Sequence, residues 1–379
     1  MREEGRISAF EAMIYQMTVP LSTIVLVVPA ITVLKARQDA WLSGILACLF
    51  GFLTVFLAAK LALRFPKQTV IEYAPRILGG VGGKLVGLVY VYYFLFVAYS
   101  VQRQFGELMS TGYYPFTPLL FFIIVLTLLA CHIVYLGLEV LCRLVVLWAF
   151  FGVSFFIILA LVLKDMEIHR FLPFLESGVG PVIAGAITPG AWLGEMALIL
   201  MILPFISDKR RVVRTSLVAV FAISFLFEIV VVASVGTMGT ETVARMLFPY
   251  FSLYRRVHIA TMPILDRQDP VLMLLWVGGM LFKLAIFFHA GVMGLGQWLG
   301  LKSHRPLIFP AGALLTALAV QAWGNITELV AFLAEVKPFF ISFVNLVLTG
   351  VLLGVAVLRG VRDELPRGEK RASADDKKA

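Results

Sequence analysis

Ten apolar stretches account for most of this chain, and each is about 18 to 29 residues long, enough for a helix to cross a membrane. Hydrophobic residues make up 60% of the 379 residues and charged residues only 15%. Soluble domains are not built from such a composition. We therefore predict ten transmembrane helices and no separate soluble domain, with spans at residues 10–34, 40–63, 85–110, 115–136, 139–163, 181–206, 212–236, 270–298, 306–323 and 337–358.

Two of these stretches carry helix-breaking residues in the middle. The first is interrupted at Thr18-Val19-Pro20-Leu21-Ser22 and the sixth at Thr188-Pro189-Gly190. A proline inside a helix removes one N–H and clashes with the carbonyl four residues back. Unpaired backbone in hydrocarbon costs several kcal/mol unless it lines a cavity or is buried in protein. Interrupted spans at matching places in two halves point to a small-solute site near the bilayer midplane.

The two breaks fall in the first span of each half of the chain. Five spans precede the loop at residues 164–180 and five follow it, so the halves must be inverted relative to each other. This pattern predicts an all-α leucine-transporter-like fold, a five-plus-five inverted repeat with broken helices 1 and 6. The expected segments are a cytoplasmic tail (1–9), the first repeat (10–163), an extracytoplasmic linker (164–180), the second repeat (181–358) and a disordered basic tail (359–379).

The distribution of basic residues orients the chain. With the N-terminus inside, 21 Lys and Arg residues fall on the inner side and ten, Lys337 among them, on the outer side. This bias predicts that both termini are cytoplasmic. Since topology accounts for the formal net charge of +9, that charge does not argue for a nucleic-acid partner.

Three ionisable residues lie deep within predicted spans: Glu195, Glu228 and Lys283. A charge at a helix centre costs about 2.5–3.5 kcal/mol on insertion scales, and such residues usually face the bundle interior. They are candidates for a coupling charge, a proton relay or an ion pair that gates a site. A purely structural ion pair that fixes helix register is the alternative.

We expect the two breaks to line one pocket, because half-helix N-termini carry partial positive charge and free N–H groups that suit a carboxylate. Tyr93 and Val97 of the third span are expected on its wall. The other candidate ligand-binding residues are Thr18, Val19, Pro20, Leu21, Ser22, Thr23, Thr188, Pro189, Gly190, Ala191 and Trp192. The chain carries no recognisable catalytic motif, and its three cysteines lack metal-binding spacing, so we predict neither an enzyme nor a cofactor or metal site.

Short motifs along most of the chain resemble the spore germination permease family, a branch of the amino acid–polyamine–organocation superfamily. They occur in order as Arg37-Gln38-Asp39-Ala40-Trp41-Leu42-Ser43, Arg64-Phe65-Pro66 with Gly79, Gly137-Leu138-Glu139 with Arg143, Leu172-Pro173, Gly194-Glu195 with Pro204-Phe205, and Arg267-Gln268-Asp269 with Trp276 and Lys283. Many relatives carry Gly-x-Gly at the first break, whereas this chain reads Thr18-Val19-Pro20. Fewer backbone N–H groups are then open to a ligand carboxylate.

The resemblance implies the B subunit of an endospore nutrient germinant receptor. Such a subunit binds a small germinant, often an amino acid, between helices 1 and 6, and has a membrane A subunit and a lipoprotein C subunit as partners. The resemblance also implies a location in the spore inner membrane or the cell membrane. Two other functions stay open from sequence, since fold does not fix function: a proton- or cation-coupled amino-acid transporter, and a water or ion channel within the germination complex.

Overall fold

The computed structural model describes residues 5–162, 166–254 and 269–363, and within these ranges the chain is almost entirely helical. The only β contact among the described residues is an isolated parallel bridge between Ile7 and Ile206. Seven helical runs in this part of the chain are each long and apolar enough to cross a membrane, and one bent pair of helices brings the number to eight. The chain is therefore a multi-pass helical membrane protein.

Each of the ten predicted stretches corresponds to one helix or to two consecutive helices. The first half contains α1 (Ala9–Ile24) with α2 (Val28–Ala36), then α3 (Ala40–Arg64), α5 (Gly80–Leu108), α6 (Leu119–Leu136) and α7 (Leu138–Val162). The second half contains α8 (Val179–Gly194) with α9 (Ile199–Ile202), then α10 (Val212–Met238), α13 (Asp269–Trp298), α14 (Ile308–Gln321), and α16 (Lys337–Ser342) with α17 (Thr349–Leu358).

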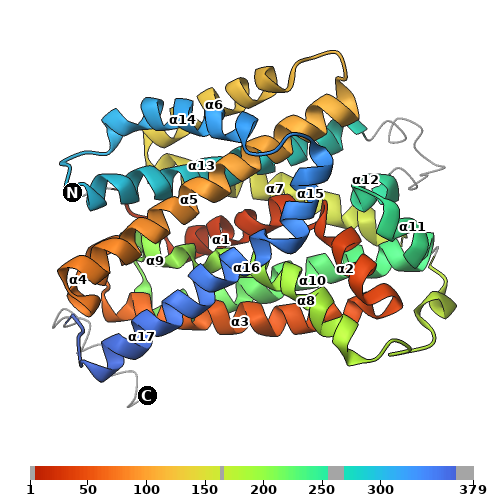
Figure 1. The fold of residues 1–379 in the computed structure, drawn as a ribbon, viewed down its shortest axis with the longest axis horizontal. Helices are drawn as coiled ribbons and strands as arrows, with labels where there is room; N and C mark the ends of the chain where they lie inside the picture. Colours follow the sequence, from red (N-terminus) through yellow and green to blue (C-terminus); the bar gives the residue numbers. More distant parts are fainter. Residues whose placement is uncertain (1–4, 163–165, 255–268, 364–379) are drawn as a thin grey trace.

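The helices form two groups that meet at α1. Helices α3, α8 and α10 pack together in one group, and α5, α6, α13 and α14 pack together in the other. Figure 1 shows the second group across the upper part of the molecule and the first group across the lower part. Helix α1 contacts α10 of the lower group and α13 of the upper group, so it lies between them.

The first span is broken, but not where the sequence analysis expected. Helix α1 continues through Pro20 to Ile24, and the break lies at residues 25–27. Polar side chains of α1 donate hydrogen bonds to backbone carbonyls of the same helix: Thr18 Oγ1 donates to Ile14 O (3.0 Å) and Ser22 Oγ donates to Thr18 O (2.7 Å). Neither bond reaches the carbonyl of Gln16, which Pro20 leaves without its helical donor; α1 tolerates its proline because neighbouring helices bury this part of it. The proline associated with the break is Pro29, in the first turn of α2, where its missing N–H has no helical partner.

The sixth span is also displaced from the expected position. Helix α8 continues through Thr188, Pro189 and Gly190 and ends at Gly194. Two 3-10 segments follow, Glu195–Leu198 and Leu203–Phe205, with the single turn of α9 between them. The helix is thus distorted from Glu195 onward, and the distorted part is buried. Both breaks lie a few residues after the predicted positions, because neither Pro20 nor Pro189 interrupts its helix.

Shorter helices connect the spans. Helix α4 (Val70–Leu78) connects α3 to α5, and the glycine-rich stretch that follows it forms the first turn of α5. Gly83 packs directly on the backbone of Pro75 in α4, which leaves no room for a side chain. Helices α11 (Thr240–Arg245) and α12 (Pro249–Tyr254) occupy part of the long connection after α10.

The last span is irregular at both ends of α16. Helix α15 (Ile326–Glu335) bends by 101° from the helical segment that ends with α14, and the chain then enters α16 at Lys337. A π-helical turn, Phe343–Leu348, separates α16 from α17. Residues 364–379, most of the predicted basic tail, lie outside the described part of the chain.

Candidate functional site

Five polar side chains from five different elements meet in the interior. Thr23 lies in the last turn of α1, Trp192 near the end of α8, and Glu195 at the start of the 3-10 segment that follows. Lys283 lies in the middle of α13, and Lys337 is the first residue of α16. Each side chain belongs to a residue that is at most 1% exposed. We call these five residues the central cluster.

The central cluster is held by short polar contacts. Lys283 Nζ lies 2.6 Å from Glu195 Oε2 and donates a second hydrogen bond to Thr23 Oγ1 (2.7 Å). Thr23 Oγ1 also accepts from Trp192 Nε1 (3.0 Å). Through these contacts the last turn of α1 is joined to α8 and α13, next to the point where each of the two broken spans loses its regular helix.

Lys337 is bound less completely. Its Nζ lies 3.7 Å from Glu195 Oε1 and 4.3 Å from the centroid of the Trp192 ring. Among the described residues it donates no hydrogen bond, and Glu195 Oε1 accepts none. The cluster therefore places two ammonium groups around one carboxylate. Buried charges are costly unless geometry and hydrogen bonds compensate them, and here one cation is only partly compensated.

Aromatic side chains and one amide form the wall next to the cluster. Asn345, in the π-helical turn, donates to the hydroxyl of Tyr93 (2.7 Å). The Tyr93 ring packs edge-on against Phe287, one turn beyond Lys283 on α13. Tyr90, one turn earlier on α5, contacts the hydroxyl of Thr349 (2.8 Å). The third span thus contributes tyrosines to the interior as the sequence suggested, and Val97 is buried on the same helix.

The structure brings together some of the predicted site residues. Thr23, Trp192, Glu195 and Lys283 are joined by hydrogen bonds, and the Tyr93 ring packs against Phe287, whose ring centroid lies 5.9 Å from Lys283 Nζ. Leu21 and Ser22 border a small cavity of about 40 Å³ between α1, α7, α12 and α13. That cavity is apolar, since its wall includes Trp148, Phe251 and Trp276.

Other predicted residues serve helix packing. Gly190 lies against the ring of Phe50 in α3, where an added Cβ would approach within 2.9 Å. The Thr18 hydroxyl bonds within its own helix, and the Thr188 hydroxyl has no hydrogen-bond partner among the described residues. Val19, Pro20, Pro189 and Ala191 are buried.

Glu228 is apart from the central cluster. It lies in α10, and its carboxylate packs against Gly44 of α3, where any side chain would collide with Oε2. Its Oε1 has no hydrogen-bond partner within the described residues. The three charges singled out from sequence therefore form one pair, Glu195 with Lys283, and one separate carboxylate.

Sequence reasoning missed Lys337 and Asn345. Lys337 was assigned to the outer side, but it is fully buried beside Glu195. One signal was available: Val336-Lys337-Pro338 begins a helix, and a cation at a helix N-terminus opposes the helix dipole unless an anion lies nearby. Asn345 gave no comparable signal, because its contact with Tyr93 depends on the π-helical turn.

The arrangement of the spans defines the class of protein. Two solved transporter structures share the fold. MhsT in complex with L-phenylalanine superposes with a TM-score of 0.64 at 15% identity, covering 94% of this chain and 90% of MhsT. Mhp1, a nucleobase-cation-symport-1 family transporter in a closed conformation with bromovinylhydantoin bound, gives a TM-score of 0.58 at 12% identity, covering 92% and 78%. The chain therefore has the leucine-transporter-like fold.

Within that class, the chain belongs to the spore germination protein family, whose model matches residues 6–323. Spore germination protein KB of Bacillus subtilis (strain 168) is 26% identical over 97% of this chain and 99% of its own length. Spore germination protein YndE of the same strain is 24% identical over 77% of this chain and 81% of its own length. These relatives and the transporter fold favour a receptor or permease over an enzyme.

Within the described ranges, no group of three or more His, Cys, Asp and Glu residues is placed to hold a metal ion.

Proposed function

We propose that this chain is the nutrient-sensing membrane subunit of a spore germinant receptor, and that it binds a small germinant with an acidic group at the central cluster. The observation that carries the proposal is the pair of buried lysines around one carboxylate, beside both broken spans. A ligand carboxylate would supply the hydrogen bonds that Lys337 lacks. An amino acid fits this requirement, and the solved structure of MhsT contains L-phenylalanine.

Residues predicted to line the ligand pocket support this site. Thr23 and Trp192 take part in the hydrogen bonds of the cluster, and Tyr93 packs against Phe287, one turn beyond Lys283. Binding at such a site requires the helices to separate, because the cluster is closed to solvent. A ligand drives that change only if its affinity differs between the closed and opened states.

In this proposal, partner subunits receive the signal that a germinant has bound. We propose that the membrane A subunit and the lipoprotein C subunit of the receptor receive this signal. We further propose that both termini are cytoplasmic and that the protein resides in the spore inner membrane or the cell membrane.

A binding and germination experiment tests the proposal. The purified chain in lipid nanodiscs is titrated with amino acids by calorimetry, and spores carrying the same variants are tested against the same panel. Lys337→Gln is expected to abolish binding and nutrient response together. Lys67→Gln, which removes an exposed lysine, is the matched control and is expected to change neither. Unchanged nutrient sensitivity in a well-expressed Lys337→Gln variant would contradict the proposed site.

The same preparation separates a receptor from a transporter. The alternative is a proton- or cation-coupled amino-acid symporter, and the fold neighbours are transporters. Proteoliposomes containing the isolated chain are expected to bind labelled amino acid without accumulating it. Accumulation driven by an ion gradient would favour the symporter instead.

A further inference from the structure

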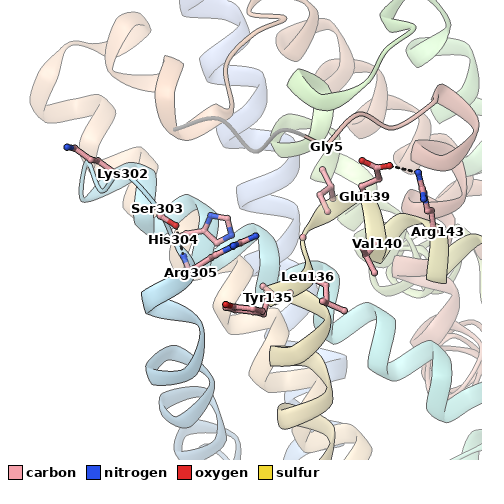
Figure 2. Close-up of a pocket in the computed structure, with 13 residues that line it drawn as sticks. Gly5, Tyr135, Leu136, Glu139, Val140, Arg143, Lys302, Ser303, His304 and Arg305 are labelled. Carbon is pink, nitrogen blue, oxygen red and sulfur yellow. Dashed lines mark hydrogen bonds and ion pairs between the residues drawn. The ribbon is translucent and has the colours of Figure 1, made fainter.

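A second cavity, unrelated to the central cluster, opens at one end of the helices. Its volume is about 480 Å³, and it lies between the turn that joins α6 to α7 and the loop that joins α13 to α14. Figure 2 shows Lys302, Arg305 and Tyr135 on one side of this cavity and Arg143 with Glu139 on the other. Each of the two connections belongs to a different half of the chain, so an occupant would contact both.

The charges lining this cavity are predominantly positive. Arg143 is paired with Glu139 in the next turn of its own helix. Lys302 and Arg305 form no ion pair with any described residue, and the Arg305 guanidinium lies 5.2 Å from the centroid of the Tyr135 ring. Three cations and one carboxylate thus line the cavity. The hydroxyl of Ser303, between the two unpaired cations, accepts from the backbone N–H of Arg305 and keeps its own proton to donate.

The rim of the cavity is apolar at the end of α6, where Leu136 lines it and is 46% exposed. Leu301 (39% exposed) directly precedes Lys302 in the chain, and Phe309 (56%) lies one turn after Arg305. Tyr135, at the end of α6, is 45% exposed, as expected for an aromatic residue at a membrane–water interface. Cations inside a cavity with apolar side chains around it match a molecule with an anionic head and hydrocarbon tails. A free anion would gain nothing from such a rim.

We propose that this cavity binds the phosphate of an anionic phospholipid headgroup. Lys302, Arg305 and the Ser303 hydroxyl contact the phosphate oxygens, and the acyl chains lie against Leu136 at the end of α6. Basic pockets between membrane helices bind anionic headgroups in this way. By joining the α6–α7 turn to the α13–α14 loop, the lipid holds the two halves of the chain together at this end.

The test measures thermal unfolding of the purified, delipidated full chain in detergent. Phosphatidylglycerol is expected to raise the midpoint temperature in a saturable way, while phosphatidylcholine and inorganic phosphate at equal concentration leave it unchanged. The double variant Lys302→Gln/Arg305→Gln is expected to weaken the apparent affinity for phosphatidylglycerol about thirtyfold, since each surface cation contributes about fivefold. Lys67→Gln, an exposed lysine outside the cavity, is expected to behave as wild type.

Three outcomes would overturn the proposal. An equal response to inorganic phosphate means a free-anion site, and an equal response to phosphatidylcholine means nonspecific solvation of apolar surface. Unchanged phosphatidylglycerol affinity in the double variant means that Lys302 and Arg305 do not bind the lipid phosphate. If the double variant does not fold, the single variant Lys302→Gln alters only an exposed side chain and is expected to show the fivefold loss. Native mass spectrometry of the intact protein gives a second readout, as one retained phosphatidylglycerol per chain.

Discussion

At the scale of single residues, the two lysines of the central cluster differ in the number of hydrogen bonds that they donate. Glu195 is the only carboxylate in it and faces two lysines, of which Lys283 has two hydrogen bonds and Lys337 has none among the described residues. Removing one member of a buried pair leaves the other charge uncompensated, which costs more than the pair itself contributes. The three charged residues therefore differ in what their loss does to stability and to response.

Glu195→Gln is expected to be the most destabilising single change in the cluster. It leaves two buried ammonium groups without a counter-charge, and breaking such a pair costs about 3–5 kcal/mol. Lys337→Met, which keeps the volume and removes the poorly compensated cation, is expected to leave stability unchanged or raise it. Thermal unfolding of the purified variants measures both. The reverse order of stability would show that Lys337, and not Glu195, is the main structural partner.

Lys283→Ala is expected to impair the germination response more than the amount of folded protein in the membrane. Through two hydrogen bonds its Nζ connects α13 to α1 and to Glu195, where the distorted part of the sixth span begins. Spore germination rate is compared with protein level by immunoblot. A normal response in a well-expressed Lys283→Ala variant would limit this residue to a structural role.

At the scale of elements, the position of each break is set by neighbours more than by proline itself. Pro20 and Pro189 both lie within continuous helices, and the breaks fall at residues 25–27 and at Glu195. The mobile hinge in any opening of the site is therefore expected at these later positions.

Pro29→Ala is expected to reduce nutrient sensitivity more than Pro20→Ala does. Pro29 lies at the start of α2, where alanine would let the helix extend back into the break. Pro20→Ala restores a helical hydrogen bond in an already continuous helix and should preserve the response. Dose–response curves for germination at matched protein levels decide between them. A larger loss from Pro20→Ala would return the hinge to the position predicted from sequence.

Gly190→Leu is expected to abolish the germination response without preventing membrane insertion. The structure suggests a cause other than filling of a ligand pocket: the new side chain meets Phe50 of α3. The double variant Gly190→Leu/Phe50→Ala distinguishes the two causes. Restored response means that packing between α3 and α8 is responsible, and persistent loss means that Gly190 borders the ligand.

The helices that occupy the ten apolar stretches could be predicted from sequence, because hydropathy over a long window reports directly on transfer of a helix into lipid. Burial of Glu195 and Lys283 could be predicted for the same reason: charged residues in such windows must turn inward. The buried location of Lys337 could not be predicted from its position within an apolar stretch. It lies at the edge of its span, and only the 101° bend before α15 and the register of α16 bring it to Glu195.

At the scale of the whole molecule, the N-terminal segment ties the first span to the sixth. Ile7 N–H donates to Phe205 O (3.0 Å), and Ser207 N–H donates to Ile7 O (2.9 Å). These two backbone hydrogen bonds connect the beginning of the first span to the end of the sixth span. Opening of the molecule at that end requires both bonds to separate.

Ile7→Pro is expected to loosen this connection, because proline has no N–H to donate to Phe205. Hydrogen exchange of backbone amides near Ser207 should become faster, with the central cluster less affected. Ile7→Val keeps the donor and a similar side chain and serves as control. Equal exchange in both variants would mean that side-chain packing, and not the bridge, closes this end.

The central cluster also has a consequence for biosynthesis. Glu195 precedes Lys283 by 88 residues. At a synthesis rate of roughly 5–20 residues per second, Glu195 exists for about 4–18 seconds before its partner leaves the ribosome. During that time the nascent sixth span carries a lone acid that disfavours release into lipid by about 2.5–3.5 kcal/mol. The span must then wait at the insertion machinery or beside earlier helices, where Thr23 is already in place, until α13 arrives.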